Sequence, residues 1–283
     1  MSVLVIAAAR FIGRNSDFAL NRSRVTDIIA VDKLTRSEKF VNLAAEKISD
    51  YIDKNDFIER VRAGTAPIPE AIFHQGACSD IMEMDGRYMM ENNYRYTLTF
   101  FEWSQKLHSL FIYASSVATY GASRVFVEGV KHEGPLNVYG YSIQKEGKLH
   151  LFEGCLDYGN GCQMRDFVYV DDGVNEAMHF LSPEKSGIFN CGTGRAQPFN
   201  DIALTVVNSL SGTDYSLEDA VAKGLIECVD FPPTLKGKYQ AFTQADFTNL
   251  RENGGYKENF GTVQHGIASN MEYLKQEQPA NAT

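Results

Sequence analysis

The stretch Val3-Leu-Val-Ile-Ala-Ala-Ala-Arg-Phe-Ile-Gly13, with Asp32 further along the chain, decides the fold class. Val3 to Ala7 is a short apolar run typical of a buried strand, and apolar residues then recur at helical spacing from Ile12 to Leu20. A second β-branched run, Val25 to Val31, ends directly before Asp32. A strand, a turn, a helix and a second strand in this order predict the start of a doubly wound α/β fold.

The turn after the first strand departs from the dinucleotide-binding fingerprint. That fingerprint places glycines where backbone N–H groups approach a pyrophosphate at a helix N-terminus. Here only Gly13 remains, and Ala7, Ala8 and Arg10 occupy positions where glycines are expected. Taken alone the turn is weak evidence for a ligand, because a plain buried strand and helix would give the same pattern.

The rest of the first half continues the alternation of strands and helices. Short strands are predicted at residues 71–73 and 110–114, with a long helix over residues 85–107 between them. This pattern predicts an α/β protein with a doubly wound parallel (Rossmann) sheet covered by helices on both faces. Ligands of such sheets bind at the carboxyl ends of the strands.

The second half predicts a smaller α/β lobe that binds the substrate. Residues 167–170 and 187–190 have strand character, and residues 200–210 have helical character with Gly212 just beyond. We therefore expect a dinucleotide-binding domain over residues 1–147 and a mainly substrate-binding lobe over residues 148–283. The boundary is soft, because the chain is expected to cross between the lobes.

Composition excludes several classes of partner and site. The chain of 283 residues carries 36 acidic and 27 basic residues, a net charge of -9, which favours neither nucleic acid nor an anionic membrane. No apolar run approaches the roughly 20 residues that span a bilayer, and no signal peptide is evident. Five scattered cysteines without metal-ligand spacing predict neither a disulfide framework nor a metal site. We expect a cytoplasmic protein.

A serine, a tyrosine and a lysine form the candidate catalytic set. Ser116 follows the predicted strand at residues 110–114, and Tyr139 and Lys145 come later in the chain. Tyrosine has an ordinary pKa of about 10, so it becomes a base near neutral pH only beside positive charge. A lysine ammonium favours the phenolate, and a serine hydroxyl can donate a hydrogen bond to the substrate oxygen.

Several longer segments make a resemblance specific. They are His74-Gln-Gly-Ala-Cys-Ser79, Asp85-Gly-Arg-Tyr-Met-Met-Glu-Asn-Asn-Tyr94, Tyr113-Ala-Ser-Ser-Val-Ala-Thr-Tyr-Gly121, Pro135-Leu-Asn-Val-Tyr-Gly-Tyr-Ser142, Leu151-Phe-Glu-Gly154, Arg165-Asp-Phe-Val-Tyr-Val170, Phe189-Asn-Cys-Gly-Thr-Gly-Arg195 and Leu235-Lys-Gly-Lys-Tyr-Gln-Ala-Phe-Thr-Gln-Ala-Asp246. In this order the chain resembles the ADP-glyceromanno-heptose 6-epimerase family, a group of extended short-chain dehydrogenases/reductases.

The resemblance implies an activity and a cofactor. Members of that family invert C6 of the heptose in ADP-D-glycero-D-manno-heptose, for the inner core of lipopolysaccharide, with a tightly bound NADP. It implies homo-oligomers, and it matches Tyr139 and Ser116 to the catalytic tyrosine and serine. The cofactor positions that it implies are Phe11, Ile12, Asp32, Lys33, Lys39, Lys54, Gln75, Gly76, Ala77, Cys78, Ser79 and Asn92.

The resemblance also implies the substrate side of the site. The positions that match its ADP-sugar contacts are Phe152, Glu153, Gly154, Arg165 and Tyr239. Arg165 suits a diphosphate because its planar guanidinium binds two oxygens at once, although pairing with Asp166 is an alternative. The choice of cofactor stays open, since Asp32 favours a free ribose hydroxyl, as in NAD, whereas Lys33 and Lys39 favour a 2′-phosphate.

The chain departs from the family pattern around the catalytic tyrosine. The family lysine one turn after Tyr139 falls on Ile143, whereas Tyr141 and Lys145 have the usual spacing. Two residues along a helix rotate a side chain by about 200°, so only one register can serve the site. A family segment with a second catalytic lysine also has no counterpart between Gly147 and Lys148. One interpretation is that the sequence lacks a segment of the natural polypeptide there.

Two other functions remain as alternatives. A nucleotide-sugar dehydratase, or another epimerase on this fold, would use the same strand and turn. A dehydratase commonly carries an acidic pair after the serine, and residues 117–119 hold no carboxylate, which favours epimerisation. The altered glycine turn supports a second alternative, a non-catalytic NADP-binding homologue.

Overall fold

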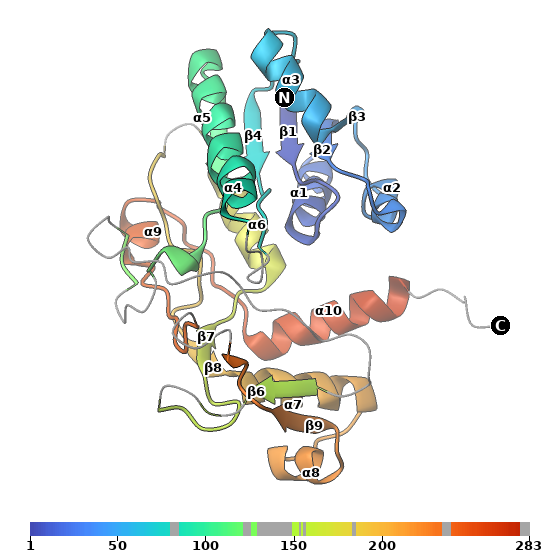
Figure 1. The fold of residues 1–283 in the computed structure, drawn as a ribbon, viewed down its shortest axis with the longest axis vertical. Coiled ribbons are helices and arrows are strands. Elements are labelled where there is room, and N and C mark those ends of the chain that lie inside the picture. The colour runs from blue at the N-terminus through green and yellow to red at the C-terminus, as the bar shows by residue number, and fades with distance from the viewer. Residues whose placement is uncertain are drawn as a thin grey trace, which may run out of the picture. The chain divides into compact units, whose positions relative to one another are not determined.

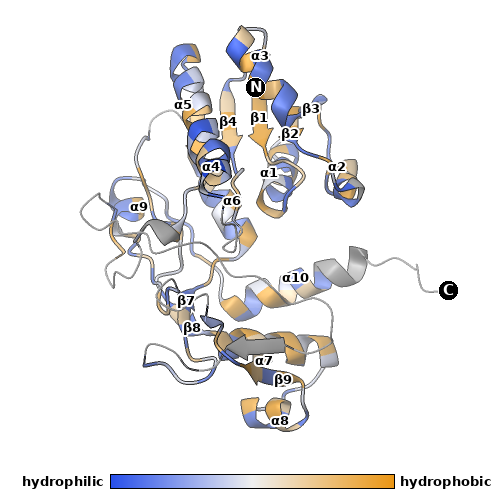
Figure 2. Ribbon diagram, viewed as in Figure 1, coloured by the Kyte–Doolittle hydropathy of each residue, from blue (hydrophilic) through white to orange (hydrophobic). Residues whose placement is uncertain are grey.

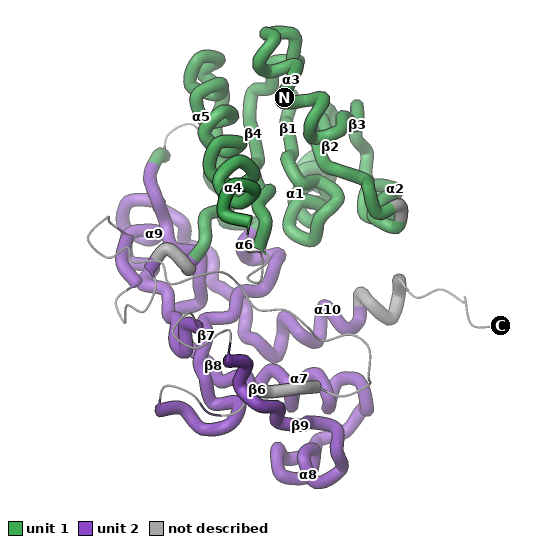
Figure 3. The backbone as a smooth tube through the Cα atoms, viewed as in Figure 1, with its two compact units in different colours: residues 1–116, 174–186 green, residues 117–173, 187–283 purple. Residues whose placement is uncertain are grey.

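The computed structural model describes residues 1–79, 85–120, 126–128, 149–152, 154, 157–182, 185–233 and 239–277. The chain divides into two compact units, coloured separately in Figure 3. The first comprises residues 1–116 and 174–186, and the second comprises residues 117–173 and 187–283. The chain therefore enters the first unit twice. The predicted boundary between residues 147 and 148 stays a prediction.

A parallel sheet forms the centre of the first unit (Figure 1). Its strands have the order β3-β2-β1-β4-β5, and every neighbouring pair is parallel. The strands are β1 (Ser2–Ile6), β2 (Asp27–Asp32), β3 (Asp50–Asp53), β4 (Ala71–His74) and β5 (Leu110–Tyr113). The predicted doubly wound parallel sheet is confirmed, and β3 is a strand that the sequence analysis did not predict.

Helices cover this sheet on both faces. They are α1 (Phe11–Arg22), α2 (Val41–Ala44), α3 (Lys54–Ala63), α4 (Gly86–Met89), a π-helix (Met90–Arg95), α5 (Tyr96–Leu107) and the end of α6 (Val170–His179), with a 3-10 turn at Ser37–Phe40. The run from α4 through α5 confirms the long helix predicted over residues 85–107. Figure 2 shows apolar strands between helices with polar outer faces.

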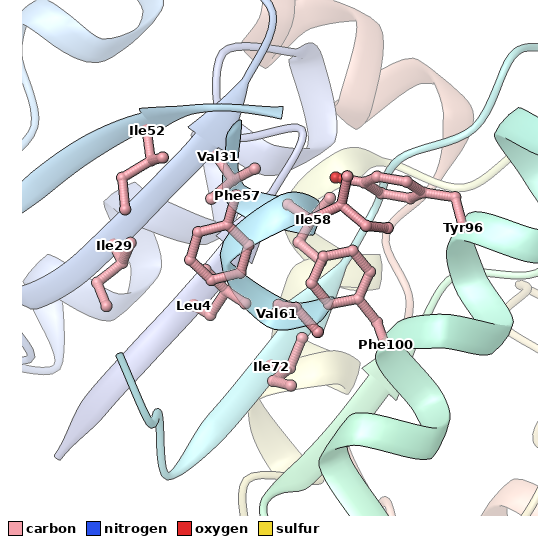
Figure 4. Packing of buried hydrophobic residues seen from close by; sticks show 11 residues of the cluster. Leu4, Ile29, Val31, Ile52, Phe57, Ile58, Val61, Ile72, Tyr96 and Phe100 are labelled. Carbon is pink, nitrogen blue, oxygen red and sulfur yellow. The ribbon is translucent and has the colours of Figure 1, made fainter. Parts of the chain in front are cut away.

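Alternating side chains of the strands supply two separate cores. Leu4 and Ile6 point to one face, where Phe57 of α3 and Phe100 of α5 pack against them (Figure 4). Val3 and Val5 point to the opposite face, against Leu20 of α1 and residues 177–178 of α6. Successive residues of a strand alternate between the faces of its sheet, so a continuous apolar run such as β1 must be buried on both sides.

The second unit contains two small sheets and several helices. Strand β6 (Leu149–Phe152) pairs in parallel with β9 (Ile226–Val229), and β7 (Met164–Asp166) pairs antiparallel with β8 (Ala196–Pro198). The helices are α7 (Phe199–Ser211), α8 (Leu217–Ala222), α9 (Thr248–Glu252) and α10 (Val263–Glu277), with a 3-10 turn at Val117–Tyr120. Helix α7 ends at Gly212, whose φ is 64°, as its sequence predicts.

Two predicted strands of this unit are wrong. Residues 167–170 do not extend β7, because Asp166 turns its carboxylate onto backbone N–H groups and a helix begins at Val170. Residues 187–190 form no ladder, because the Asn190 N–H donates to Glu128 Oε1 instead. In both segments the β-branched and aromatic residues give strand character that the local hydrogen bonds override.

Candidate functional site

The turn between β1 and α1 has the backbone of a dinucleotide-binding loop. Ala7 has a φ of 67°, in the left-handed region that favours glycine. Its N–H donates to the Val31 carbonyl oxygen at 2.7 Å, and the Arg10 N–H donates to the Ala7 carbonyl oxygen at 3.0 Å. A Cβ at Gly13 would lie 2.1 Å from that carbonyl oxygen. Gly13 is therefore required for α1 to approach the turn.

The N-terminus of α1 faces this turn without a side-chain cap. Arg10 is the residue before the helix, with φ of -103° and ψ of 168°, and its side chain accepts no capping hydrogen bond. The first N–H groups of a helix have no partner within the helix, and they carry partial positive charge. An uncapped helix start of this kind suits a phosphate group.

Asp32 ends β2 and holds three donors around its carboxylate. Its side chain is buried and accepts from the Ala9 N–H at 3.0 Å and from the Lys33 N–H at 2.6 Å. The Lys39 ammonium forms an ion pair with it at 3.0 Å. These donors fill most of the roughly four acceptor positions of a carboxylate.

Lys54, the first residue of α3, places a second ammonium in the same region. It donates to Asn92 Oδ1 and lies 4.5 Å from the centre of the Tyr96 ring. Burial lowers the pKa of Lys54, and the positive charges of Arg10 and Lys33 lower it further. The Tyr96 hydroxyl is buried and has no hydrogen-bond partner among the described residues. Burial and the nearby Asp32 carboxylate raise the Tyr96 pKa.

The segment after β4 is fixed by side chains of the following helices. His74 is buried, and its Nε2 lies 2.8 Å from Thr97 Oγ1. Burial and the nearby Lys54 lower the His74 pKa to about 4, so the ring is neutral at pH 7. Asn93 accepts from the Cys78 N–H at 2.7 Å and donates to its carbonyl oxygen at 2.9 Å. These contacts hold the loop at residues 75–79 at the carboxyl edge of the sheet.

A pocket at this edge collects part of the predicted cofactor set. Its lining residues are Ile6, Ala7, Arg10, Val31, Asp32, Lys33, Lys54, Gly76, Ala77, Tyr88, Asn92 and Tyr96. Lys39 contacts the pocket through its ion pair with Asp32. The remaining predicted positions do not line it: Phe11 and Ile12 are exposed on the first turn of α1, and Gln75, Cys78 and Ser79 belong to the loop after β4.

The predicted catalytic residues are only partly within the described structure. Ser116 is exposed beyond the end of β5, at the carboxyl edge of the sheet. Tyr139 and Lys145 lie outside the described residues, and so does Glu153 of the predicted substrate set. Phe152 is the last residue of β6, and its side chain lies outside the described part. The roles of all five residues stay predictions.

In the second unit, Arg165 lies among aromatic side chains. Its guanidinium carbon is 5.0 Å from the centre of the Tyr239 ring and 5.9 Å from that of Phe199. One guanidinium nitrogen donates to the Met164 carbonyl oxygen at 3.0 Å. Two residues of the predicted substrate set, Arg165 and Tyr239, are thus neighbours. A third, Gly154, donates its N–H to Asn160 Oδ1 at 2.8 Å.

Asp166 acts as an anchor for two loops. Its carboxylate accepts from the Thr193 N–H at 2.8 Å, the Thr193 hydroxyl at 2.6 Å, the Gly194 N–H at 2.9 Å and the Ala245 N–H at 2.9 Å. A Cβ at Gly192 would lie 2.8 Å from Asp166 Oδ2, so only glycine lets this loop approach. The carboxylate therefore holds backbone donors.

The sequence analysis did not assign several residues of these two regions. Asn93 lies in the segment from Asp85 to Tyr94 that was matched to the family, but only Asn92 was taken from that segment, and Tyr96 lies two residues beyond it. Arg10 was counted only as a lost glycine of the turn, although it lines the pocket. A cation at the turn after the first strand is a signal that the sequence carries by itself.

Two kinds of feature are absent from the part of the chain that the structure describes. Within those residues no helix is both long enough and apolar enough to cross a membrane. The same residues contain no group of three or more histidine, cysteine, aspartate or glutamate side chains that could hold a metal ion.

Solved structures with the same fold include nucleotide-sugar epimerases. The chain is similar to ADP-L-glycero-D-manno-heptose-6-epimerase of Helicobacter pylori, with 19% identity, a TM-score of 0.70 and coverage of 97% of this chain and 96% of that one. It is also similar to UDP-Glc/GlcNAc 4-epimerase of Campylobacter jejuni, with 18% identity, a TM-score of 0.71 and coverage of 97% and 99%. A third similar structure is UDP-glucuronic acid 4-epimerase of Bacillus cereus in complex with UDP-glucuronic acid and NAD. Its sequence identity is 18% and its TM-score is 0.74, with coverage of 98% of this chain and 100% of that one.

At these identities the likeness establishes the shared fold. The family follows from the sequence model of the NAD dependent epimerase/dehydratase family, which matches residues 3–146. This match covers the β1–α1 turn, the pocket at the sheet edge, and Ser116. The chain therefore belongs to the NAD dependent epimerase/dehydratase family, on a Rossmann-type fold shared with nucleotide-sugar epimerases.

Proposed function

We propose that this enzyme inverts C6 of the heptose in ADP-D-glycero-D-manno-heptose with the help of a bound NADP. The pocket at the carboxyl edge of the sheet carries this proposal. There, an uncapped helix start, a turn with left-handed Ala7 and several cations surround a buried carboxylate. The choice of ADP-heptose rests on the sequence segments that resemble the 6-epimerase family, such as Leu235 to Asp246.

The residues of this pocket fit a phosphate-bearing dinucleotide. Gly13 lets the start of α1 reach the turn, because any Cβ there would overlap the Ala7 carbonyl oxygen. Tyr96 lines the pocket, and its buried hydroxyl has no hydrogen-bond partner among the described residues. Parallel sheets of this kind bind ligands at this edge.

The contacts of Asp32 favour NADP over NAD. An acidic residue at this position selects NAD when its carboxylate accepts from a ribose hydroxyl. Here the carboxylate already accepts from the Ala9 and Lys33 N–H groups and from the Lys39 ammonium. Lys33 and Lys54 add positive charge to the same pocket, which suits a 2′-phosphate.

The chemistry of the proposal divides between cofactor and chain. NADP, when bound, would supply a reversible hydride acceptor for the carbon that is inverted. Tyr139 is the proposed acid/base group, which removes the proton from the sugar hydroxyl and gives it back. Lys145, whose spacing is the usual one for Tyr141, would favour the phenolate of whichever tyrosine lies beside it. Ser116 donates a hydrogen bond to the same sugar oxygen. Since the hydride returns, the reaction involves no net oxidation.

On the substrate side, Arg165 and Tyr239 are proposed to hold the ADP portion, with Phe152, Glu153 and Gly154 beside them. The guanidinium carbon of Arg165 lies over the Tyr239 ring, 5.0 Å from its centre, and this contact helps to hold the side chain in place. An arginine oriented in this way can bind two oxygens of a diphosphate.

The direct test is an assay by proton NMR. Purified protein, without added cofactor, should convert ADP-D-glycero-D-manno-heptose into its L-glycero epimer, and heat-released cofactor should be NADP by mass. UDP-glucose and UDP-N-acetylglucosamine serve as competing substrates. If the protein converted a UDP-sugar but not the ADP-heptose, the proposed substrate would be wrong, and the protein would still be an epimerase.

Two tyrosine variants decide the catalytic register. Tyr139→Phe should abolish turnover and leave NADP bound, because only the acid/base hydroxyl is lost. Tyr141→Phe is the matched control, and it should keep most of the activity. The reverse result would assign the role to Tyr141 with Lys145.

A non-catalytic NADP-binding protein is the second candidate. The left-handed Ala7 and the arginine at position 10 favour it, because both depart from the turn of active members. Protein that releases NADP on heating but converts no nucleotide sugar would support this candidate. The expected homo-oligomer and cytoplasmic location stay predictions, the first of which analytical ultracentrifugation can test.

A further inference from the structure

The pocket in the first unit has an excess of positive charge. Three cationic side chains line it, those of Arg10, Lys33 and Lys54, and the carboxylate among the lining residues is that of Asp32. That carboxylate already forms an ion pair with Lys39 at 3.0 Å. Within the described part of the chain, none of the three lining cations forms an ion pair. Among the lining residues positive charge therefore exceeds negative charge, which favours an anionic ligand.

The Arg10 side chain is held at the pocket. One of its terminal guanidinium nitrogens donates to the Ala77 carbonyl oxygen at 3.1 Å, which links the β1–α1 turn to the loop after β4. A guanidinium has five N–H donors in a planar fork, so this contact leaves several donors for a ligand. Arginine forks of this kind bind phosphate oxygens in pairs.

The electrostatics of Lys54 support the same conclusion. Its pKa is lowered first by burial and then by the positive charges of Arg10 and Lys33. The three cations therefore lie close enough to repel one another in the absence of an anion. A phosphate group would reverse that repulsion, and it would raise the Lys54 pKa.

We propose that Arg10 is a phosphate-binding residue of this pocket, whose guanidinium takes over the contact that a glycine backbone makes in the usual fingerprint. The proposal rests on the proposed dinucleotide site. Its ligand is a phosphate group of the dinucleotide, from either the diphosphate bridge or the 2′-phosphate. Arg10 is thus a ligand residue, and the loss of glycine at this position is compensated by a charged side chain.

Binding measurements by calorimetry test this assignment without any turnover. The variants are Arg10→Gln, Arg10→Gly and, as matched control, Arg22→Gln, which removes the same charge from the far end of α1. The ligands are NADP, NAD and inorganic pyrophosphate. Both Arg10 variants should bind NADP about tenfold more weakly than the wild type, as expected when one charge-assisted hydrogen-bond pair is lost. Arg22→Gln should bind it unchanged.

The Arg10→Gly variant distinguishes an arginine that binds phosphate from an arginine that obstructs the cofactor. It restores the fingerprint glycine, so an obstructing arginine would give binding that is as tight as the wild type or tighter, and the proposal would fall. A loss shared by NADP and NAD assigns Arg10 to the diphosphate, and a loss confined to NADP assigns it to the 2′-phosphate. If the wild type binds neither dinucleotide, the proposed function fails separately. Pyrophosphate then tests the role of Arg10 alone, because the Arg10→Gln variant must still bind it more weakly than the wild type.

Discussion

Replacing Asp17 by valine is expected to stabilise the protein by several kcal/mol at neutral pH. Asp17 belongs to the inward stripe of α1 with Gly13, Ser16 and Leu20, and its side chain is fully buried. Neither carboxyl oxygen has a hydrogen-bond partner within the described structure. Burial, with a smaller contribution from the charge of Glu46, raises the Asp17 pKa from 3.8 to about 8. An unpaired buried carboxylate is among the most costly groups that a core can contain.

The size of the effect follows from the two pKa values. Between 3.8 and about 8 the folded chain retains a proton on Asp17 that the unfolded chain releases. The free energy of unfolding therefore falls as pH rises through this interval, and it is unaffected by Asp17 below the lower value. At about 1.4 kcal/mol per pH unit, the loss between pH 4 and pH 7 is about 4 kcal/mol. Valine is similar in volume and carries no charge, so it avoids this loss.

Urea unfolding from about pH 5 to about pH 8 measures the effect. Asp17→Val should be more stable than the wild type, by a margin that grows with pH. Asp17→Asn should also remove the pH slope but gain less, because its buried amide still lacks partners. Asp27→Asn is the control, since Asp27 is exposed at the start of β2. The pKa of Glu46 is also raised by burial, so a smaller slope should remain. Parallel pH profiles for the wild type and Asp17→Val would refute the reasoning.

Three other substitutions and one mass measurement have defined outcomes. Ala7→Gly should raise the free energy of unfolding by about 1 kcal/mol, because glycine adopts the left-handed φ of 67° without strain; an unchanged value in urea would count against it. Asp166→Asn should lower stability by about 2 kcal/mol, because an amide nitrogen cannot accept from the N–H groups now bound, and a thermal shift below a degree would contradict this. Ser216→Ala removes a capping box and should cost about 1 kcal/mol with NADP affinity intact, as calorimetry would check. Peptide mass mapping should find further residues between Gly147 and Lys148, and a contiguous peptide from Gln144 to Leu151 would exclude them.

Much of the first unit is predictable because its signals are local. An apolar run such as β1, followed by a helical stripe and Asp32, specifies strand, turn and helix without distant information. The strand β3 escaped prediction because Asp50 and Asp53 stand at its ends, and an edge strand of four residues has little apolar pattern. Residues 167–170 were predicted to be a strand and are not one. The following Asp171 and Asp172 favour the start of a helix there.

The site was predictable only where the sequence resembles known segments. The contact between Lys54 and Asn92 joins residues on different helices, and no periodicity in the chain foretells it. The ion pair of Lys39 with Asp32 is likewise not indicated by any periodicity of the sequence. Composition and spacing can indicate that cations follow β2, but tertiary packing decides which of them faces a carboxylate and which remains for a ligand.

The altered turn shows which glycine of the fingerprint the fold cannot replace. At Gly13 the Cβ of any other residue would overlap with the Ala7 carbonyl group, so packing alone requires glycine. At position 7 the requirement is a backbone angle, which alanine meets at the cost of strain. At position 10 φ is negative, and the fingerprint glycine there serves only the approach of a ligand. A side chain is tolerated at that position on structural grounds, and if it carries charge of the right sign it can bind the ligand itself. Glycine is therefore required by packing at position 13, favoured by the backbone angle at position 7, and replaceable by a ligand-binding side chain at position 10.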